Sequence, residues 1–353
     1  MTERHPANTL PVFNLDSWES LSPDNRQALA RELGLVCHEL GFFYLQSDGF
    51  DALQRDVQHQ MERFFSLPDS VKTTLDKTHS PQFRGWDRLG AEKTNNLQDY
   101  REQLDIGPER DPIECPTHYF QRLVGPNQWP QENELPGFRA SVKNYINCMD
   151  QIASRLLDVM SVALGFDLSY LRNTFGNDPC PYLKLIRYPE SESGTQGVGT
   201  HKDSGYLTLL LQDDVGGLQT QDAQGNWFDI TPIPGTLVVN VGELMQMATA
   251  NYFVAAPHRV ISPTATTRYS CAYFHSPDLM TPLEVLPVSS EILSTVANSV
   301  AHTNAGIMAS KMEMERGSDP LQSTMTHTLF GEKYWERWVR SYPDIARSFH
   351  GDL

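Results

Sequence analysis

The stretch HKDSGYLTLLLQ at residues 201–212 joins a polar motif to an apolar run. The second part, Tyr206 to Gln212, has the length and the aliphatic content of a buried strand. From Pro181 onward such runs recur between turns, at residues 183–188, 218–222, 227–230, 236–241, 258–261 and 269–275. Gln224-Gly225-Asn226 predicts a hairpin turn between two of them. Many short, evenly spaced strands predict a sandwich or barrel, and two sheets in a jelly roll fit this number.

Upstream of these strands the pattern is mainly helical. Ser22-Pro23-Asp24 is a typical helix start, and apolar residues then recur at helical spacing as far as Leu40. Residues 51–66 and 136–164 predict two further helices, and residues 288–341 predict helices again. Residues 81–130 are rich in Gly, Pro and mixed charge, which predicts loops with short strands.

Two polar residues precede the strand at 206–212, and a third begins a later strand. His201 and Asp203 are two residues apart, so that in an extended segment both can point into one cavity, and His258 follows much later. Two imidazoles and one carboxylate can bind a metal on one face and leave three positions open, as in non-heme Fe(II) sites. The same ligands also suit Mn, Co, Ni and Zn, so the metal stays open. Three unrelated polar residues are the alternative.

A buried arginine is predicted on the strand RYSCAYF at residues 268–274. Alternation places Arg268 and Ser270 on the same face as Ala272 and Phe274. Burying an arginine is costly unless it meets an anion, and a guanidinium beside a hydroxyl suits one end of a dicarboxylate. A structural salt bridge is the alternative.

The order of these motifs, His-x-Asp, then His followed by Arg-Val, then Arg-x-Ser, resembles the Fe(II)/2-oxoglutarate-dependent oxygenases of the isopenicillin N synthase-like family. Other stretches carry the same resemblance, over roughly residues 10 to 280: LGFFYL at 40–45, FFSLP at 64–68 and LIRYP at 185–189. The runs QDDVGGL at 212–218 and CAYFH at 271–275 are most similar to bacterial ethylene-forming enzyme and its relatives.

The resemblance implies a mainly β fold with helices and a double-stranded β-helix core. In this division residues 1–180 are an N-terminal α/β region with helices, residues 181–285 are the core, and residues 286–353 are a C-terminal helical extension packed on the core.

The resemblance also implies a chemistry. His201, Asp203 and His258 would be the catalytic Fe(II) ligands, and Arg268 and Ser270 would hold the distal carboxylate of 2-oxoglutarate. With O2 as the oxidant, a small molecule would be hydroxylated or similarly oxidised, with release of succinate and CO2.

The resemblance suggests further residues that contact the cosubstrate. Tyr188 lies where family members often place a tyrosine that reaches 2-oxoglutarate, although Ile186 stands where Asn is usual. Plain packing of Tyr188 inside the barrel is the alternative.

Candidate substrate residues follow from the same resemblance, which places the loop at 81–110 over the pocket mouth. Glu92 and Thr94 could bind a cationic or amino group there, and Arg101 lies in the same loop. Lys184 takes the place of an arginine of ethylene-forming enzymes and could meet an anion, and Phe274 is a fifth candidate. Solvated loop charges and a lysine that extends to solvent are the alternatives.

Three other functions stay open from the sequence. The first is ethylene-forming fragmentation of 2-oxoglutarate itself, and the second is an isopenicillin N synthase-type oxidase that uses no 2-oxoglutarate. The third is a non-catalytic metal-binding jelly roll that acts as a sensor or scaffold.

Composition restricts the partners. The 353 residues carry 28 Lys and Arg against 44 Asp and Glu, a formal net charge of −16, which disfavours nucleic acid and anionic membranes as partners. No apolar signal region or long apolar run is present, so neither a signal peptide nor a membrane span is predicted. Five scattered cysteines without a CxxC pair predict reduced thiols in a cytoplasmic protein. The oligomeric state stays open.

Overall fold

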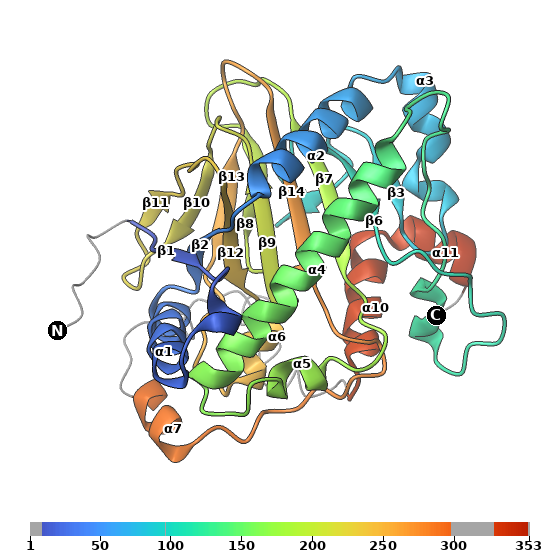
Figure 1. Ribbon diagram of the computed structural model, residues 1–353. Helices are drawn as coiled ribbons and strands as arrows, with labels where there is room; N and C mark the ends of the chain where they lie inside the picture. The colour runs from blue at the N-terminus through green and yellow to red at the C-terminus, as the bar shows by residue number, and fades with distance from the viewer. Residues whose placement is uncertain (1–8, 96, 298–327, 352–353) are drawn as a thin grey trace.

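Two β-sheets packed face to face form the centre of the computed structural model, which describes residues 9–95, 97–297 and 328–351 (Figure 1). The larger sheet has the strand order β1-β2-β12-β9-β14-β7-β6-β3, and the smaller has the order β11-β10-β13-β8. The strands of the larger sheet are β1 (Val12–Asn14), β2 (Phe42–Gln46), β3 (Gly85–Asp87), β6 (Glu102–Ile106), β7 (Tyr182–Tyr188), β9 (Leu207–Gln212), β12 (Thr236–Val241) and β14 (Arg268–His275). Those of the smaller sheet are β8 (Gln196–His201), β10 (Leu218–Gln221), β11 (Trp227–Asp229) and β13 (His258–Ile261), while β4 (Lys93–Thr94) and β5 (Leu97–Gln98) pair on their own.

The chain alternates between the two sheets from β7 to β14. Only β11 breaks this alternation, because it is the antiparallel partner of β10 in the hairpin. Ile186 and Val238 of the larger sheet belong to one buried cluster with Val198, Leu218 and Val260 of the smaller. The predicted jelly-roll core is therefore confirmed, and its interior lies between these two faces.

From residue 181 onward the strand predictions agree with the structure to within one residue at each end, except that β8 was missed. Strand β6 lies in the segment 81–130, where short strands were predicted but not located. Strand β8, with the sequence QGVGTH, contains two glycines and no apolar alternation. Strand β6, with the sequence EQLDI, is completely buried although it carries two acidic residues. Both sequences look like loops because they contain glycines or acidic residues. They form strands nevertheless, because their polar groups have partners that only the folded chain provides.

Helices cover the outer face of the larger sheet, where α4 crosses the strands diagonally (Figure 1). The three helices predicted upstream are confirmed to within two residues: α1 (Pro23–Glu39), α2 (Phe50–Phe65) and α4 (Phe138–Ala163). The buried side of α4 carries apolar residues at the spacing of one helical face, among them Val142, Tyr145, Met149, Ile152 and Leu156. Shorter helices are α3 (Asp69–Lys72), α5 (Tyr170–Thr174) and α6 (Glu243–Ala248), with 3₁₀ turns η1 (Trp18–Ser20), η2 (Thr73–Leu75), η3 (Lys77–His79) and η4 (Tyr119–Leu123).

The C-terminal helices predicted at 288–341 are α7 (Ser290–Ala297) and α10 (Phe330–Ser341), followed by α11 (Pro343–His350). Residues 298–327 of that prediction lie outside the described residues. The rings of Trp335 and Trp338 on α10 pack against Phe83, which attaches this end of the chain beside β3 and β6 (Figure 1). None of the helices in the described residues is both long and apolar enough to cross a bilayer.

Four strands of the larger sheet, β1, β2, β3 and β6, come from residues before 181. The N-terminal region and the core thus share one sheet and one layer of helices. The boundaries at 180 and 285 stay a prediction.

Candidate metal centre and anion site

His201, Asp203 and His258 come together where β8 ends and β13 begins. The two histidines are direct partners in the antiparallel register of these strands. The Nε2 atoms of His201 and His258 lie 3.8 and 3.7 Å from Oδ1 of Asp203. One ligating atom from each residue fits within 4.8 Å of the others, which is the spacing of a three-ligand metal site.

Backbone carbonyls fix which nitrogen of each histidine faces the shared space. Nδ1 of His201 lies 2.8 Å from the carbonyl oxygen of Gly199, and Nδ1 of His258 lies 3.2 Å from that of Ala256. A carbonyl only accepts, so each Nδ1 carries the proton and each Nε2 keeps a lone pair for a metal.

Two neighbouring strands orient the carboxylate. Oδ2 of Asp203 accepts hydrogen bonds from Nδ2 of Asn240 at 2.8 Å and from the hydroxyl of Thr208, which leaves Oδ1 directed at the imidazoles. Thr208 and Asn240 are direct partners on β9 and β12. The sequence did not reveal these two supporting residues, although each is a lone polar residue within an apolar strand.

The protonation of the site suits metal binding. Burial and the neighbouring His258 lower the pKa of His201 to about 4. Burial alone would raise the pKa of Asp203, but the two histidines and the hydrogen bonds from Asn240 and Thr208 hold it below its usual value. At neutral pH the donors therefore include the neutral imidazole of His201 and the ionised carboxylate of Asp203.

Arg268 lies on β14 and is fully buried, at 0% exposure. Its guanidinium donates to the Ser270 hydroxyl at 3.2 Å and to Oε1 of Gln212 at 3.5 Å, and it faces the ring of Tyr188 at 4.9 Å. Among the described residues no carboxylate forms an ion pair with it, and its Nε has no hydrogen-bond partner. The salt-bridge alternative finds no carboxylate partner among the described residues, and a buried guanidinium with an unpartnered Nε is suited to an anion.

The register of the larger sheet places the remaining candidates on the inward face. Tyr188 is the partner of Arg268, and Lys184 lies four residues before it on the same face of β7. Phe274 of β14 is the partner of Thr208, so it flanks the residues that support Asp203.

The loop at 81–110 packs directly on the strand that carries His201. Asn95 donates to the carbonyl of Thr200 at 2.9 Å, and the Thr94 hydroxyl donates to Asp99 at 2.8 Å. A Cβ atom at Gly199 would lie 2.9 Å from Cβ of Thr94, so only glycine permits this approach. The loop therefore packs against the end of β8, next to His201, whose side chain stays 33% exposed.

Glu92, which belongs to this loop, is the central residue of a buried cluster of charged side chains. Its Oε1 accepts from Nζ of Lys184 at 3.0 Å, and its Oε2 is paired with the Arg101 guanidinium. Burial raises the pKa of Glu92, but Lys184 and Arg101 bring it well below its usual value. Lys184 is only 4% exposed. The alternatives of solvated loop charges and a solvent-reaching lysine are therefore wrong.

A second group of carboxylates, Asp87, Glu92 and Asp105, also has the spacing of a metal site. The ammonium of Lys77 lies against Asp87 and Asp105, and it contacts the Tyr342 hydroxyl at 2.6 Å. Lys77 and Lys184 are thus cations of this group, and Lys77 also connects the C-terminal helices to the β6-β3 edge of the larger sheet. Sequence reasoning missed both Lys77 and Tyr342.

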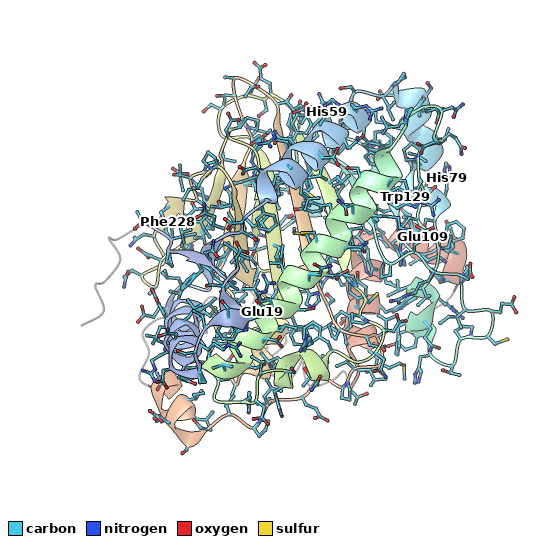
Figure 2. The ribbon with its side chains drawn as sticks, in the orientation of Figure 1. Glu19, His59, His79, Glu109, Trp129 and Phe228 are labelled. Carbon is cyan, nitrogen blue, oxygen red and sulfur yellow. The ribbon has the colours of Figure 1, made fainter. Side chains whose placement is uncertain are left out.

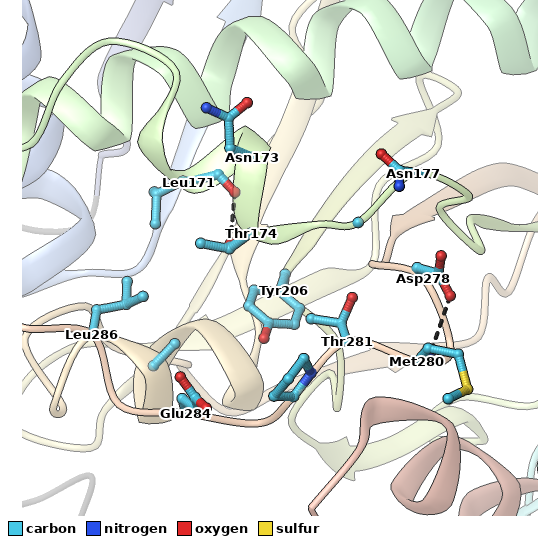
Figure 3. A pocket seen from close by; sticks show the side chains of 13 residues that line it. Leu171, Asn173, Thr174, Asn177, Tyr206, Asp278, Met280, Thr281, Glu284 and Leu286 are labelled. Atoms are coloured by element: carbon cyan, nitrogen blue, oxygen red, sulfur yellow. Dashed lines mark hydrogen bonds between the residues drawn. The ribbon is translucent and has the colours of Figure 1, made fainter.

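A surface pocket of about 420 Å³ lies apart from the metal centre (Figure 3). It opens between α5 and the segment after β14, with Asn173 and Asn177 on one side and Asp278 and Thr281 on the other (Figure 3). None of the candidate metal ligands lines it.

The remaining described histidines are not among the three candidate metal ligands. His59 and His79 are exposed and lie at the periphery of the molecule (Figure 2). His275 is buried, stacks on Phe175 with ring centroids 4.9 Å apart, and has Nδ1 3.2 Å from the Tyr273 hydroxyl.

His275 is expected to make the metal-free fold sensitive to acid. Burial lowers its pKa to about 4, whereas an unfolded histidine titrates near 6.5, so the unfolded chain binds the proton first. The free energy of unfolding should then fall by about 1.5 kcal/mol as pH drops from 6.5 to 5. Urea denaturation of the wild type and His275→Gln at both pH values measures this difference. Equal pH slopes in the two proteins would contradict it.

Comparison with known proteins gives two family matches along this chain. Residues 10–132 match the family described as non-haem dioxygenase in morphine synthesis N-terminal, and residues 171–277 match the 2OG-Fe(II) oxygenase superfamily. The second match covers all three candidate metal ligands and both Arg268 and Ser270.

Individual relatives are similar over most of their length. The chain is 30% identical to the 2-oxoglutarate-dependent dioxygenase frbJ of Dothideomycetidae sp., over 97% of this chain and 92% of the relative. It is 30% identical to a homoarginine-6-hydroxylase of Glycine max, over 79% and 88%. Among solved structures, a full-length Neurospora crassa protein in complex with alpha-KG and thymine is 26% identical, with a TM-score of 0.69 over 82% of this chain and 93% of that one.

Proposed function

This chain belongs to the 2OG-Fe(II) oxygenase superfamily, and from that premise we propose that His201, Asp203 and His258 hold its iron. The protein is a 2-oxoglutarate-dependent dioxygenase, which uses Fe(II), 2-oxoglutarate and O2 to oxidise a small molecule. The observation that carries the ligand assignment is the convergence of two Nε2 atoms and one Oδ1 atom, each oriented by a hydrogen bond on its far side. Two neutral imidazoles and a carboxylate are the donor set that Fe(II) takes in this enzyme class.

Arg268 and Ser270 bind the distal carboxylate of 2-oxoglutarate. The orphan Nε of Arg268 and its full burial support this role, because a buried guanidinium without an acidic partner fits an anion. The Tyr188 ring faces the guanidinium and limits where the cosubstrate chain can lie.

When bound, iron supplies the oxidative decarboxylation of 2-oxoglutarate to succinate and CO2 and the oxidising power for the substrate. The protein's own contribution is positional. Thr208 and Asn240 prevent Asp203 from turning away, and the backbone carbonyls at Gly199 and Ala256 hold both imidazole rings in one tautomer.

The substrate is a small amino acid, bound by Glu92, Thr94, Arg101, Lys184 and Phe274. Relatives named for such substrates support this class: homoarginine-6-hydroxylases of Glycine max and Oryza sativa, and the 1-aminocyclopropane-1-carboxylate oxidase of Dictyostelium discoideum. Glu92 stays ionised and suits an amino or guanidino group, and Lys184 suits a carboxylate. The five cysteines are all free, which supports the predicted cytoplasmic location.

The relatives named 2-oxoglutarate-dependent dioxygenases support an enzyme that uses 2-oxoglutarate over both an oxidase without this cosubstrate and a non-catalytic scaffold. Formation of ethylene stays an open prediction, because no comparison bears on it.

Succinate release tests the proposal. Purified enzyme with Fe(II) and 2-oxoglutarate is offered amino acids, nucleobases and small secondary metabolites, and headspace gas is sampled for ethylene. Stimulation of succinate formation by amino acids is the expected result. Stimulation by nucleobases alone would contradict the substrate class, and no succinate under any condition would contradict the iron and cosubstrate sites.

A further inference from the structure

Arg101 places a second buried guanidinium beside Tyr188, on the side opposite Arg268. Strand β6 pairs with β7 so that Glu102 faces Arg187. Arg101 directly precedes β6, and continuing this register by one position places it opposite Tyr188. Tyr188 is in turn the partner of Arg268 on β14. The three residues therefore form one row across the sheet, with an arginine on each side of Tyr188.

Arg101 points inward, as Arg268 does. Residues two apart on a strand share a face, and Gln103 of β6 lies opposite Ile186, which belongs to the buried cluster between the sheets. The Arg101 side chain is 11% exposed. The guanidinium is therefore mostly buried on the inward face, next to the loop.

Only part of the Arg101 guanidinium has partners in the structure. Its Nη2 is paired with Glu92 and, at 3.5 Å, with Asp99. Its Nε is buried and has no hydrogen-bond partner among the described residues, as is also true of Arg268. The edge of a guanidinium that contains Nε is suited to a carboxylate, and a buried N–H without a partner is costly.

We propose that Arg101 binds a second carboxylate through Nε, on the side of Tyr188 opposite the one that Arg268 serves. The inference rests on the proposed function, because it assumes that 2-oxoglutarate lies between Arg268 and the metal. Neighbouring strands are about 4.8 Å apart, so the backbones of the two arginines are roughly 10 Å apart. That span holds the two carboxylates of one small dicarboxylate, or one carboxylate each from cosubstrate and substrate.

The carboxylate has two possible sources, the metal-chelating end of 2-oxoglutarate or the acid group of the substrate. Binding experiments separate them. Anaerobic calorimetry measures the affinity of the Fe(II) enzyme for 2-oxoglutarate, and then the affinity of the Fe(II)–2-oxoglutarate enzyme for L-homoarginine and 1-aminocyclopropane-1-carboxylate.

Two variants and one control make the test specific. Arg101→Gln removes the donor, and Arg101→Lys keeps a charge for Glu92 and Asp99 but has no N–H at the position of Nε. Arg88→Gln removes an exposed arginine of the same loop and serves as the matched control. Melting temperature and circular dichroism establish that each variant is folded.

Arg101→Gln is expected to weaken binding of the relevant carboxylate by about 10- to 100-fold and Arg101→Lys by about 10-fold, with Arg88→Gln unchanged. A loss in 2-oxoglutarate affinity assigns the site to the cosubstrate, and a loss confined to an amino acid assigns it to the substrate. If both affinities stay within about twofold, or if Arg101→Lys binds as the wild type does, the proposal is wrong. Failure of the underlying function would look different, because the wild type itself would then not bind 2-oxoglutarate.

Discussion

Replacing Asp203 with alanine is expected to abolish both Fe(II) binding and succinate formation. Asp203 supplies the only negative charge among the three proposed ligands, because a histidine binds a metal ion as a neutral imidazole. Without it, two imidazoles would have to hold a dication in a buried space with no charge compensation. The loss should exceed the roughly 10- to 100-fold effect that is typical of residues that only support a ligand.

Two measurements check this outcome. Equilibrium dialysis with Fe(II) under anaerobic conditions gives the metal content, and succinate assays give turnover. Asp214→Ala is the matched control, since Asp214 is an exposed carboxylate on the turn after β9. Wild-type turnover by Asp203→Ala, at wild-type metal content, would mean that the metal is bound elsewhere.

The residues that define the candidate site could be predicted because they follow chain-local rules. His201 and Asp203 are neighbours in sequence, and alternation alone places Arg268 and Ser270 on one face of β14. The strands were predictable for a similar reason, since short apolar runs between turns are visible in one dimension.

The residues that support the site could not be predicted in this way. Asn240 reaches Asp203 only because β12 pairs with β9, and Lys77 meets Tyr342 across 265 residues of chain. Strand β6 was hidden for the same reason, because Asp105 and Glu102 are tolerable inside the protein only with Lys77, Lys72 and Arg187 beside them. Such pairs depend on tertiary contacts, which a single sequence does not reveal.

Replacing Arg268 with methionine is expected to remove the response to 2-oxoglutarate without weakening the fold. A bidentate, charge-assisted contact to a carboxylate is worth about 3 kcal/mol or more, so the affinity should fall about 100-fold. The stability of the protein without 2-oxoglutarate should not depend on Arg268 in this way. Its buried guanidinium has no acidic partner within ion-pair distance among the described residues. An apolar side chain of similar length avoids the cost of burying that charge, so stability should be equal or higher.

Thermal or urea unfolding with and without 2-oxoglutarate separates the two effects. At a concentration 100 times the wild-type Kd, 2-oxoglutarate should stabilise the wild type by about 2.7 kcal/mol and Arg268→Met by about 0.4 kcal/mol. Arg187→Met is a useful contrast, because Arg187 is paired with Glu102 on the opposite face of β7, at 2.6 Å. That variant should lose stability and keep its response to 2-oxoglutarate. If Arg268→Met instead loses stability and keeps the response, then Arg268 is a structural residue, and the cosubstrate carboxylate must be held by another cation of the inward face.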